Sequence, residues 1–193
     1  GSTVWNDEKN WMEIWNNVFM EYVKDENWNF YKSAMQNVDT WMWLERITRT
    51  LVWAPSVYET DVFIDIIEEI CLVLGVEYNE ENKKDIRIIA DHARTSVMMI
   101  SDWIVPSNVD QGYILRRLLR RAIRSAYKMW FEWQFMSKIA LKVISKFENI
   151  YEAVKNNKDK IGFLNILIVL VNVNYFVVSV SINPSLKRIT RCA

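Results

Sequence analysis

Glycine is scarce in this chain, with four residues among 193, whereas ordinary usage would supply about thirteen. Cysteine is scarcer still: Cys71 and Cys192 stand far apart, and neither belongs to a Cys/His cluster. These absences exclude a disulfide scaffold and a structural zinc site, and they fit a reducing compartment such as the cytoplasm. Lysine plus arginine equals aspartate plus glutamate at 24 each, so net charge by itself predicts no partner.

Several signals of targeting and catalysis are also missing. Residues 1–30 carry charge throughout, which predicts no secretory signal there, and without an initiator methionine we expect a fragment or a processed chain. The sequence has no Ser-His-Asp set and no P-loop. The single histidine, His92, lies in a helical pattern beside Asp91 and Arg94. We interpret it as a hydrogen-bonded structural residue rather than as a base or a metal ligand.

The apolar pattern predicts strands first and helices afterwards. Aromatic and β-branched side chains predict strands at 11–23, 29–34 and 37–43, with a polar turn at 25–30. The period then becomes helical, and it predicts helices at 44–51, 62–75, 82–103, 109–129 and 134–154. The predicted fold class is therefore α+β, a small antiparallel sheet followed by a helical domain, with a boundary near residue 55.

The apolar stretch "GFLNILIVLVNVNYFVVSVSI" at 162–182 allows two interpretations. It is long enough for a transmembrane helix, which needs about 20 apolar residues. Its many β-branched residues, together with polar side chains spaced two apart (Asn172 and Asn174, Ser179 and Ser181), instead favour a strand.

Two groups of arginines suggest phosphate chemistry. Arg46, next to Glu45, follows an apolar strand and opens a helix, where it can meet a phosphate oxygen or serve as a surface charge. The segment "GYILRRLLRRAIRSAYK" at 112–128 is denser in positive charge. Its basic residues form two adjacent helical rows, Arg116, Arg120 and Arg124 in one and Arg117 and Arg121 in the other, with Lys128 beyond them. The opposite face is predicted to hold Ile114, Leu115, Leu118, Leu119 and Ile123. This helix is either a nucleic-acid surface or a solvated face whose long stems cover the core.

Five strings, taken together, carry a specific resemblance. They are "EIWNNVFMEY" (13–22), "NVDTWMWLERI" (37–47), "PSVYETDVF" (55–63), "RIIADHARTSVMMISD" (87–102) and "VPSNVDQGYILRRLLRRAIR" (105–124). In this order and spacing, the chain resembles the alanyl-tRNA synthetases, which are class II aminoacyl-tRNA synthetases, over about residues 5–160.

The resemblance implies a domain organisation and an activity. Residues 1–55 would be the C-terminal part of the catalytic domain, including motif 3, and residues 56–161 the start of a helical tRNA-recognition domain. Residues 162–193 have no counterpart, and we expect a frameshifted, non-native tail there rather than a membrane anchor. The implied activity is attachment of alanine to tRNA with ATP and Mg²⁺. A fragment without motifs 1 and 2 and without the family's zinc site is expected to be inactive alone, and the alternative is a non-catalytic module that binds the acceptor stem.

The resemblance also assigns residues. Arg46, with Glu45 beside it, would contact ATP phosphate, and Asp39 would hold the amino group of alanine. Asn16 would line the alanine pocket, with Trp15 in its framework and Trp41 next to Asp39. Asn108 would inspect the G·U wobble pair of the tRNA-Ala acceptor stem. The arginines of 116–124 would contact phosphates of that stem.

Tryptophan, at ten residues, is as abundant as glycine is rare. The family has glycine where this chain has Trp41 and Trp43, and the same holds for six further tryptophans, at 5, 28, 53, 103, 130 and 133. We hypothesise that these eight are UGA codons that the source organism reads as glycine. Reassignment would give twelve glycines and two tryptophans, close to ordinary usage. If the indoles are present, Trp41 is expected to fill the alanine pocket and prevent alanine-dependent ATP–pyrophosphate exchange.

Overall fold

The computed structural model describes residues 11–131 and 135–162, which fall into two compact units, one ending at Phe63 and the other beginning at Ile64. Trp5, Trp133, Cys192 and the predicted apolar tail from residue 163 onward lie outside the described residues.

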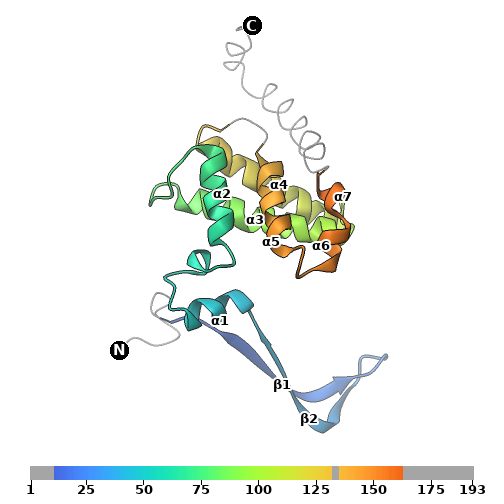
Figure 1. The fold of residues 1–193 in the computed structure, drawn as a ribbon. Coiled ribbons are helices and arrows are strands. Elements are labelled where there is room, and N and C mark those ends of the chain that lie inside the picture. Colours follow the sequence, from blue (N-terminus) through green and yellow to red (C-terminus); the bar gives the residue numbers. More distant parts are fainter. Residues whose placement is uncertain (1–10, 132–134, 163–193) are drawn as a thin grey trace, which may run out of the picture. The chain divides into compact units, whose positions relative to one another are not determined.

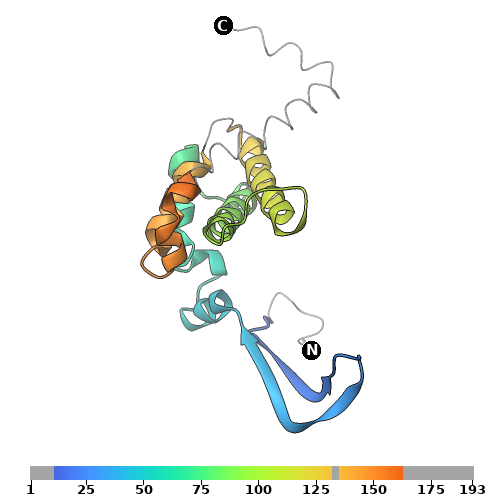
Figure 2. The same ribbon diagram turned by 90° about the vertical axis from the view of Figure 1, so that its right-hand side faces the viewer.

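The first unit is a long hairpin followed by a short helix (Figures 1 and 2). Strand β1 (Trp15–Lys24) pairs with β2 (Phe30–Met42) in antiparallel fashion, and α1 (Leu44–Leu51) and the 3₁₀ turn η1 (Val57–Glu59) follow. The prediction of separate strands at 29–34 and 37–43 was wrong, because β2 is continuous. The partner of Met20 is Asn37 and that of Tyr22 is Lys32, so the extra residues of β2 form a bulge without ending the strand.

The hairpin has no interior of its own. Large apolar side chains are exposed on both strands, among them Phe19, Tyr22, Phe30 and Met35. A two-stranded sheet is at best marginally stable in water, since it buries little apolar surface. The hairpin by itself therefore leaves these apolar side chains uncovered.

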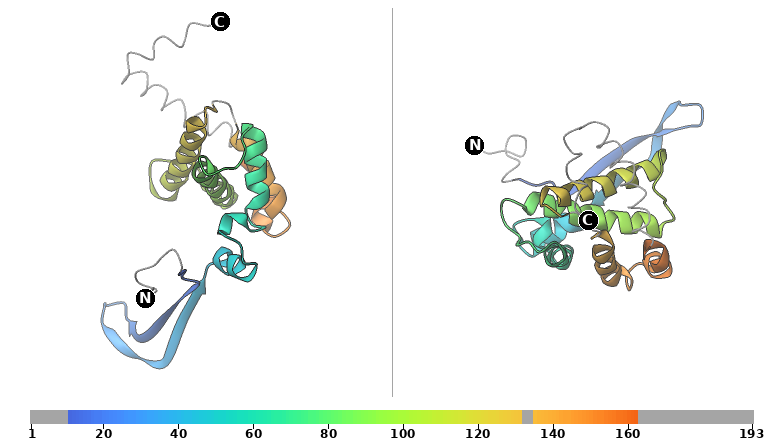
Figure 3. Two further views of the ribbon diagram at one scale, coloured as in Figure 1. Left: turned by 90° about the vertical axis from the view of Figure 1, so that its left-hand side faces the viewer. Right: turned by 90° about the horizontal axis from the view of Figure 1, so that it is seen from above.

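The second unit is a bundle in which α3 is central. Its helices are α2 (Ile64–Leu74), α3 (Lys83–Ser101), α4 (Asp110–Lys128), α5 (Met136–Phe147), α6 (Glu152–Asn156) and α7 (Lys158–Gly162). Helix α3 packs along α4 and also contacts α2, α5, α6 and α7, and Figure 3 shows α3 and α4 side by side. The fully buried side chains include Ile66 and Ile70 of α2, Ile86 and Ile89 of α3, Leu115 and Leu119 of α4, and Ile139 and Val143 of α5.

The predicted helix 134–154 is broken in its middle. Helix α5 ends at Phe147, whose carbonyl accepts hydrogen bonds from the backbone N–H groups of Ile150 and Tyr151, and α6 begins at Glu152. Phe147 and Val154 are both buried and stand seven residues apart, a helical spacing that continues through the turn. The apolar pattern therefore could not reveal the break.

One ion pair joins the two long helices of the bundle. Lys128 Nζ of α4 donates to Asp85 Oδ1 of α3 at 2.9 Å. Burial by itself would raise the pKa of Asp85, but hydrogen bonds from Lys128 and Ser125 outweigh burial and hold this pKa below its ordinary value. The charge of Lys128, which the sequence grouped with the arginines of 116–124, is thus used within the fold.

No helix in the described ranges 11–131 and 135–162 combines the length and the apolar composition that crossing a membrane requires.

Candidate functional site

One face of the hairpin brings together the residues predicted for an amino-acid pocket. Asn16 of β1 stands directly opposite Trp41 of β2, and Val18 stands opposite Asp39. Side chains two apart on a strand share a face, and directly opposed Cβ atoms lie about 5 Å apart. Asn16, Asp39 and Trp41 therefore share one face. The other face carries Thr40, whose hydroxyl donates to Asn17 Oδ1 at 2.7 Å.

The two indoles dominate this end of the hairpin. The rings of Trp41 and Trp43 lie 6.4 Å apart between centroids at an angle of 33°. Trp41 is 54% exposed, so its ring stands beside Asp39 on an open face and packs into no core. A small ligand bound at Asp39 would meet this ring.

Three groups hold Arg46 in the first turn of α1. Its guanidinium donates to the backbone carbonyl of Glu13 at 2.9 Å, lies 3.4 Å from the Glu13 carboxylate, and sits over the Trp43 ring at 5.0 Å from the centroid. Glu45 lies in the same first turn, where a carboxylate is favoured by the helix dipole. An anion that binds Arg46 must therefore compete with Glu13.

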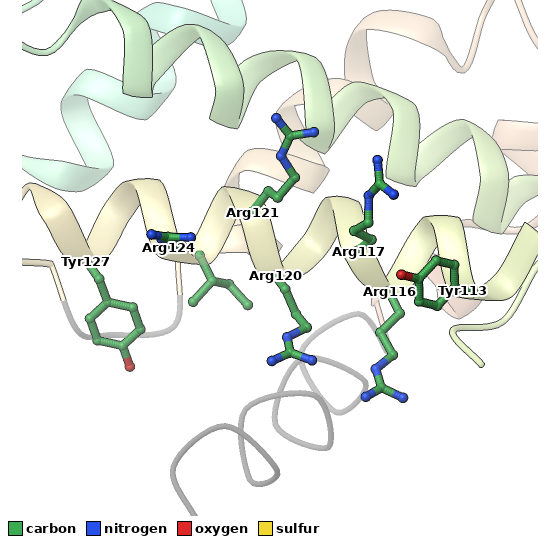
Figure 4. A pocket seen from close by; sticks show the side chains of 8 residues that line it. Tyr113, Arg116, Arg117, Arg120, Arg121, Arg124 and Tyr127 are labelled. Carbon is green, nitrogen blue, oxygen red and sulfur yellow. The ribbon is translucent and has the colours of Figure 1, made fainter. Parts of the chain in front are cut away.

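Helix α4 presents its arginines away from the bundle. Its buried residues are Gly112, Leu115, Leu119, Ala122, Ile123, Ser125 and Ala126. Ile114 was predicted on this face, but it is exposed. Figure 4 shows Arg117 and Arg121 on one side of the helix and Arg116 and Arg120 on the other. A groove of about 310 Å³ is lined by all five arginines with Tyr113, Ile123 and Tyr127.

The loop before α4 is tied to the arginine helix. Arg116 donates a hydrogen bond to Asn108 Oδ1, so the amide of Asn108 is oriented by the first arginine of the helix. Ser107 Oγ stabilises the same loop by donating to the Val109 carbonyl at 2.9 Å and accepting from the Val109 N–H at 3.3 Å.

Gly112 lets the loop approach the helix this closely. A Cβ placed on Gly112 would lie 2.3 Å from Ser107 Oγ and 2.4 Å from the Val105 carbonyl oxygen. Both distances are far below van der Waals contact, and the second involves backbone that cannot rotate away. The position of Asn108 beside Arg116 therefore depends on the missing side chain of Gly112.

Other reactive groups in the described residues form no site. His92 is buried in α3, with Nδ1 at 3.0 Å from Asp91 Oδ2. Burial raises the pKa of the Cys71 thiol, which disfavours the reactive thiolate. Within residues 11–131 and 135–162, no three His, Cys, Asp or Glu side chains are grouped as metal ligands.

Sequence reasoning missed four residues that contribute to these sites. Glu13 lies 33 residues from Arg46, and only the pairing of Trp15 with Met42 brings the two together. Gly112 could have been noticed because it is one of only four glycines and lies inside a predicted helix, where glycine is unfavourable. Tyr113 and Tyr127 flank the arginines at both ends of the groove, as stacking partners for bases or guanidinium groups would.

Several known proteins with similar sequences belong to one kind of enzyme. A sequence model of the family described as tRNA synthetases class II (A) matches residues 1–165. The chain is 42% identical over 158 residues to an alanine–tRNA ligase of Pseudothermotoga lettingae, a match that covers 81% of this chain and 18% of that protein. It is 41% identical over 153 residues to the alanine–tRNA ligase of Borrelia hermsii (77% and 26%) and over 152 residues to that of Treponema denticola (77% and 25%). The chain thus spans about a fifth to a quarter of the length of these relatives.

Proposed function

The chain belongs to the class II (A) family of tRNA synthetases, and we propose that it carries two parts of an alanine–tRNA ligase. One part, in the first unit, would contribute to the site where alanine and ATP react. The other, in the helical unit, would hold the acceptor stem of tRNA-Ala. Because the proposed activity belongs to protein synthesis, we expect the protein in the cytoplasm.

The observation that carries the proposal is the arginine face of α4. Five guanidinium groups and two tyrosines line one groove, while the opposite face of the helix is buried against α3. A purely solvated face would need no such density of arginine, and arginine is the side chain best suited to phosphate oxygens. We therefore assign this face to the phosphates of an RNA duplex.

Asn108 supplies the proposed base contact. The wide, shallow minor groove of an RNA duplex exposes base edges to side chains, whereas its major groove is too deep and narrow for them. With Oδ1 accepting from Arg116, the amide N–H₂ of Asn108 keeps its donors for an acceptor on the RNA. We propose that these donors inspect the G·U pair, while the arginines set the register.

In the first unit, Asp39, Asn16 and Arg46 have proposed roles toward the small substrates. The carboxylate of Asp39 would pair with the ammonium group of alanine, with the amide of Asn16 on the same strand face. Arg46, with Glu45 beside it, would neutralise an ATP phosphate once it is released from Glu13. ATP is expected to bring Mg²⁺, but no ligand set for that ion is grouped among the described residues, so we assign no step to it.

RNA binding by the whole chain tests the proposal. We expect a hairpin carrying the acceptor-stem sequence of tRNA-Ala to bind in a filter assay, with affinity falling by about two to three orders of magnitude between 50 and 200 mM salt if five phosphates are contacted. A duplex with G·C in place of G·U should bind more weakly at every salt concentration. Absence of binding at 50 mM salt, or binding that is insensitive to salt, would contradict the assignment of α4.

Alanine activation is the second measurement. With the indole of Trp41 beside Asp39, we expect no detectable alanine-dependent exchange of pyrophosphate into ATP. The same crowding favours the alternative function, a non-catalytic module that binds the acceptor stem. Exchange above the level measured without alanine would refute the expectation and leave the ligase as the function of this polypeptide.

A further inference from the structure

Four tryptophans have a backbone conformation that tryptophan rarely adopts. The φ angles of Trp28, Trp53, Trp103 and Trp130 are +69°, +55°, +66° and +62°. Only one further residue other than glycine in the described part of the chain has a positive φ, namely Asp110. The Cβ of any residue other than glycine is crowded in this region. Aspartate can offset the strain because its short polar side chain hydrogen-bonds locally, whereas tryptophan has no such compensation.

Three of the four end a helix in the same way. After α1, α3 and α4, the tryptophan N–H bonds to the carbonyl three residues earlier, and the next N–H bonds back five residues: Ala54 to Arg49 at 3.0 Å, Ile104 to Met99 at 3.1 Å and Phe131 to Ala126 at 3.2 Å. This is the Schellman arrangement, whose left-handed residue is usually glycine.

Helix α2 provides an internal comparison. It ends with the same backward bond, from Val76 to the Cys71 carbonyl at 3.1 Å, and its left-handed residue is Gly75 with φ of +65°. Trp28 lies at the end of the hairpin turn, where its N–H bonds to the Asp25 carbonyl at 3.1 Å and Trp28 itself is the left-handed residue. The same helix ending therefore uses glycine once and tryptophan three times, and the hairpin turn adds a fourth left-handed tryptophan.

These four indoles are largely exposed, although Lys24 Nζ lies over the Trp28 ring. Trp28, Trp53, Trp103 and Trp130 are 73%, 90%, 70% and 94% exposed, whereas tryptophan is on average highly buried. Removing their rings would thus uncover no core. Each residue combines a strained backbone with a large apolar side chain that is mostly exposed, and glycine would remove both features.

We propose that these four positions are encoded by UGA and are glycine in the protein that the source organism makes. UGA differs by one base from UGG, the tryptophan codon, and by one base from the glycine codon GGA. A UGA codon that arose from GGA, if translated as though it were UGG, would place tryptophan where the source organism inserts glycine. Backbone geometry supports glycine at these four positions independently of the proposed function, and the codon relationship supplies the link to UGA.

The geometry also limits the inference. Trp43 has φ of −94° and ψ of 117°, an ordinary extended conformation, and Trp41 lies in a regular strand with a negative φ. The backbones of Trp41 and Trp43 therefore give no independent reason to expect glycine. Whether the Trp41 indole is present beside Asp39 is a separate question, and sequencing codons 41 and 43 answers it.

The coding DNA and the native protein test the proposal directly. We expect TGA at codons 28, 53, 103 and 130, and TGG at codon 15, because Trp15 lies in a strand with a negative φ and serves as the matched control. Peptide mass spectrometry of the protein isolated from its source should find glycine at the four positions and tryptophan at 15. TGG codons, or tryptophan-containing peptides at the four positions, would overturn the proposal.

Stability measurements on the whole chain test the physical argument separately. Trp103→Gly and Trp130→Gly should each raise the Tm by about 2–8 °C, whereas Trp103→Ala, which keeps Cβ at the same φ, should leave it nearly unchanged. Leu141→Gly, at an exposed position inside α5, is the control for a generic effect of glycine and should lower the Tm. Glycine variants at 103 and 130 that melt at or below the parent would contradict the argument.

Discussion

Replacing Arg117, Arg121 and Arg124 together by glutamine is expected to weaken binding to an acceptor-stem duplex by about two orders of magnitude or more at 0.1 M salt. Each phosphate contact contributes about 0.9 to the slope of log K against log salt, so the slope should become shallower by about three. These three side chains are exposed and lie away from the buried face of α4, so the fold should survive the change. Filter binding across a salt series measures both quantities.

The matched control removes the same charge elsewhere on the helical unit. Lys138 and Lys142 of α5 and Lys155 of α6 can be changed to glutamine, which lowers net charge by the same three units. If only total charge mattered, both triple variants would lose affinity equally, and the assignment of the α4 face would be wrong. We expect the lysine variant to stay within a few fold of the parent and to retain its salt slope.

The second large effect is expected for Gly112→Ala. Here the sign of the change in the free energy of unfolding is itself informative, because helix propensity and steric crowding predict opposite signs. In an unconstrained helix, alanine is more favourable than glycine by about 1 kcal/mol. At Gly112 the added Cβ would meet Ser107 Oγ at 2.3 Å and the Val105 carbonyl at 2.4 Å, and overpacking of this kind costs about 1–3 kcal/mol or more. We expect net destabilisation, measured by urea unfolding, and weaker discrimination of G·U from G·C because the Asn108 loop moves.

Gln111→Ala is the control for this substitution. It is the neighbouring residue in the first turn of α4 and is exposed, so its replacement should change the free energy of unfolding by no more than about 0.5 kcal/mol. A Gly112→Ala variant as stable as the parent would show that the loop is not held by close packing against the helix, and would remove the structural reason for the position of Asn108.

Local patterns were sufficient to predict most of the helices. The helix predicted at 44–51 is α1, and those predicted at 62–75, 82–103 and 109–129 lie within two residues of α2, α3 and α4 at both ends. Apolar spacing of this kind is a property of neighbouring residues, so it can be read without knowing the fold. The break after Phe147 was missed because it does not interrupt the apolar pattern, whereas the bulge in β2 was wrongly predicted as a gap between two strands.

The functional residues also fall into two groups, those found from the sequence alone and those that only the fold brings together. The arginines of α4 and the Glu45-Arg46 pair are contiguous in sequence, and their chemistry follows from residue type and helical spacing alone. The family, too, was evident from the order of short strings, and the comparisons confirm it. Strand register, by contrast, was needed to place Asn16 opposite Trp41 and Glu13 against Arg46.

The scarcity of glycine and the excess of tryptophan were visible in the sequence, and they raised the question of what stands at those positions. Only the tertiary structure separated the tryptophans, because φ depends on where helices end and where the hairpin turns. Four of them have left-handed backbones that a Cβ disfavours, while Trp41 and Trp43 do not. Composition is a sum over the chain, whereas strain belongs to a single residue in its place, and for that reason the structure was needed to decide it.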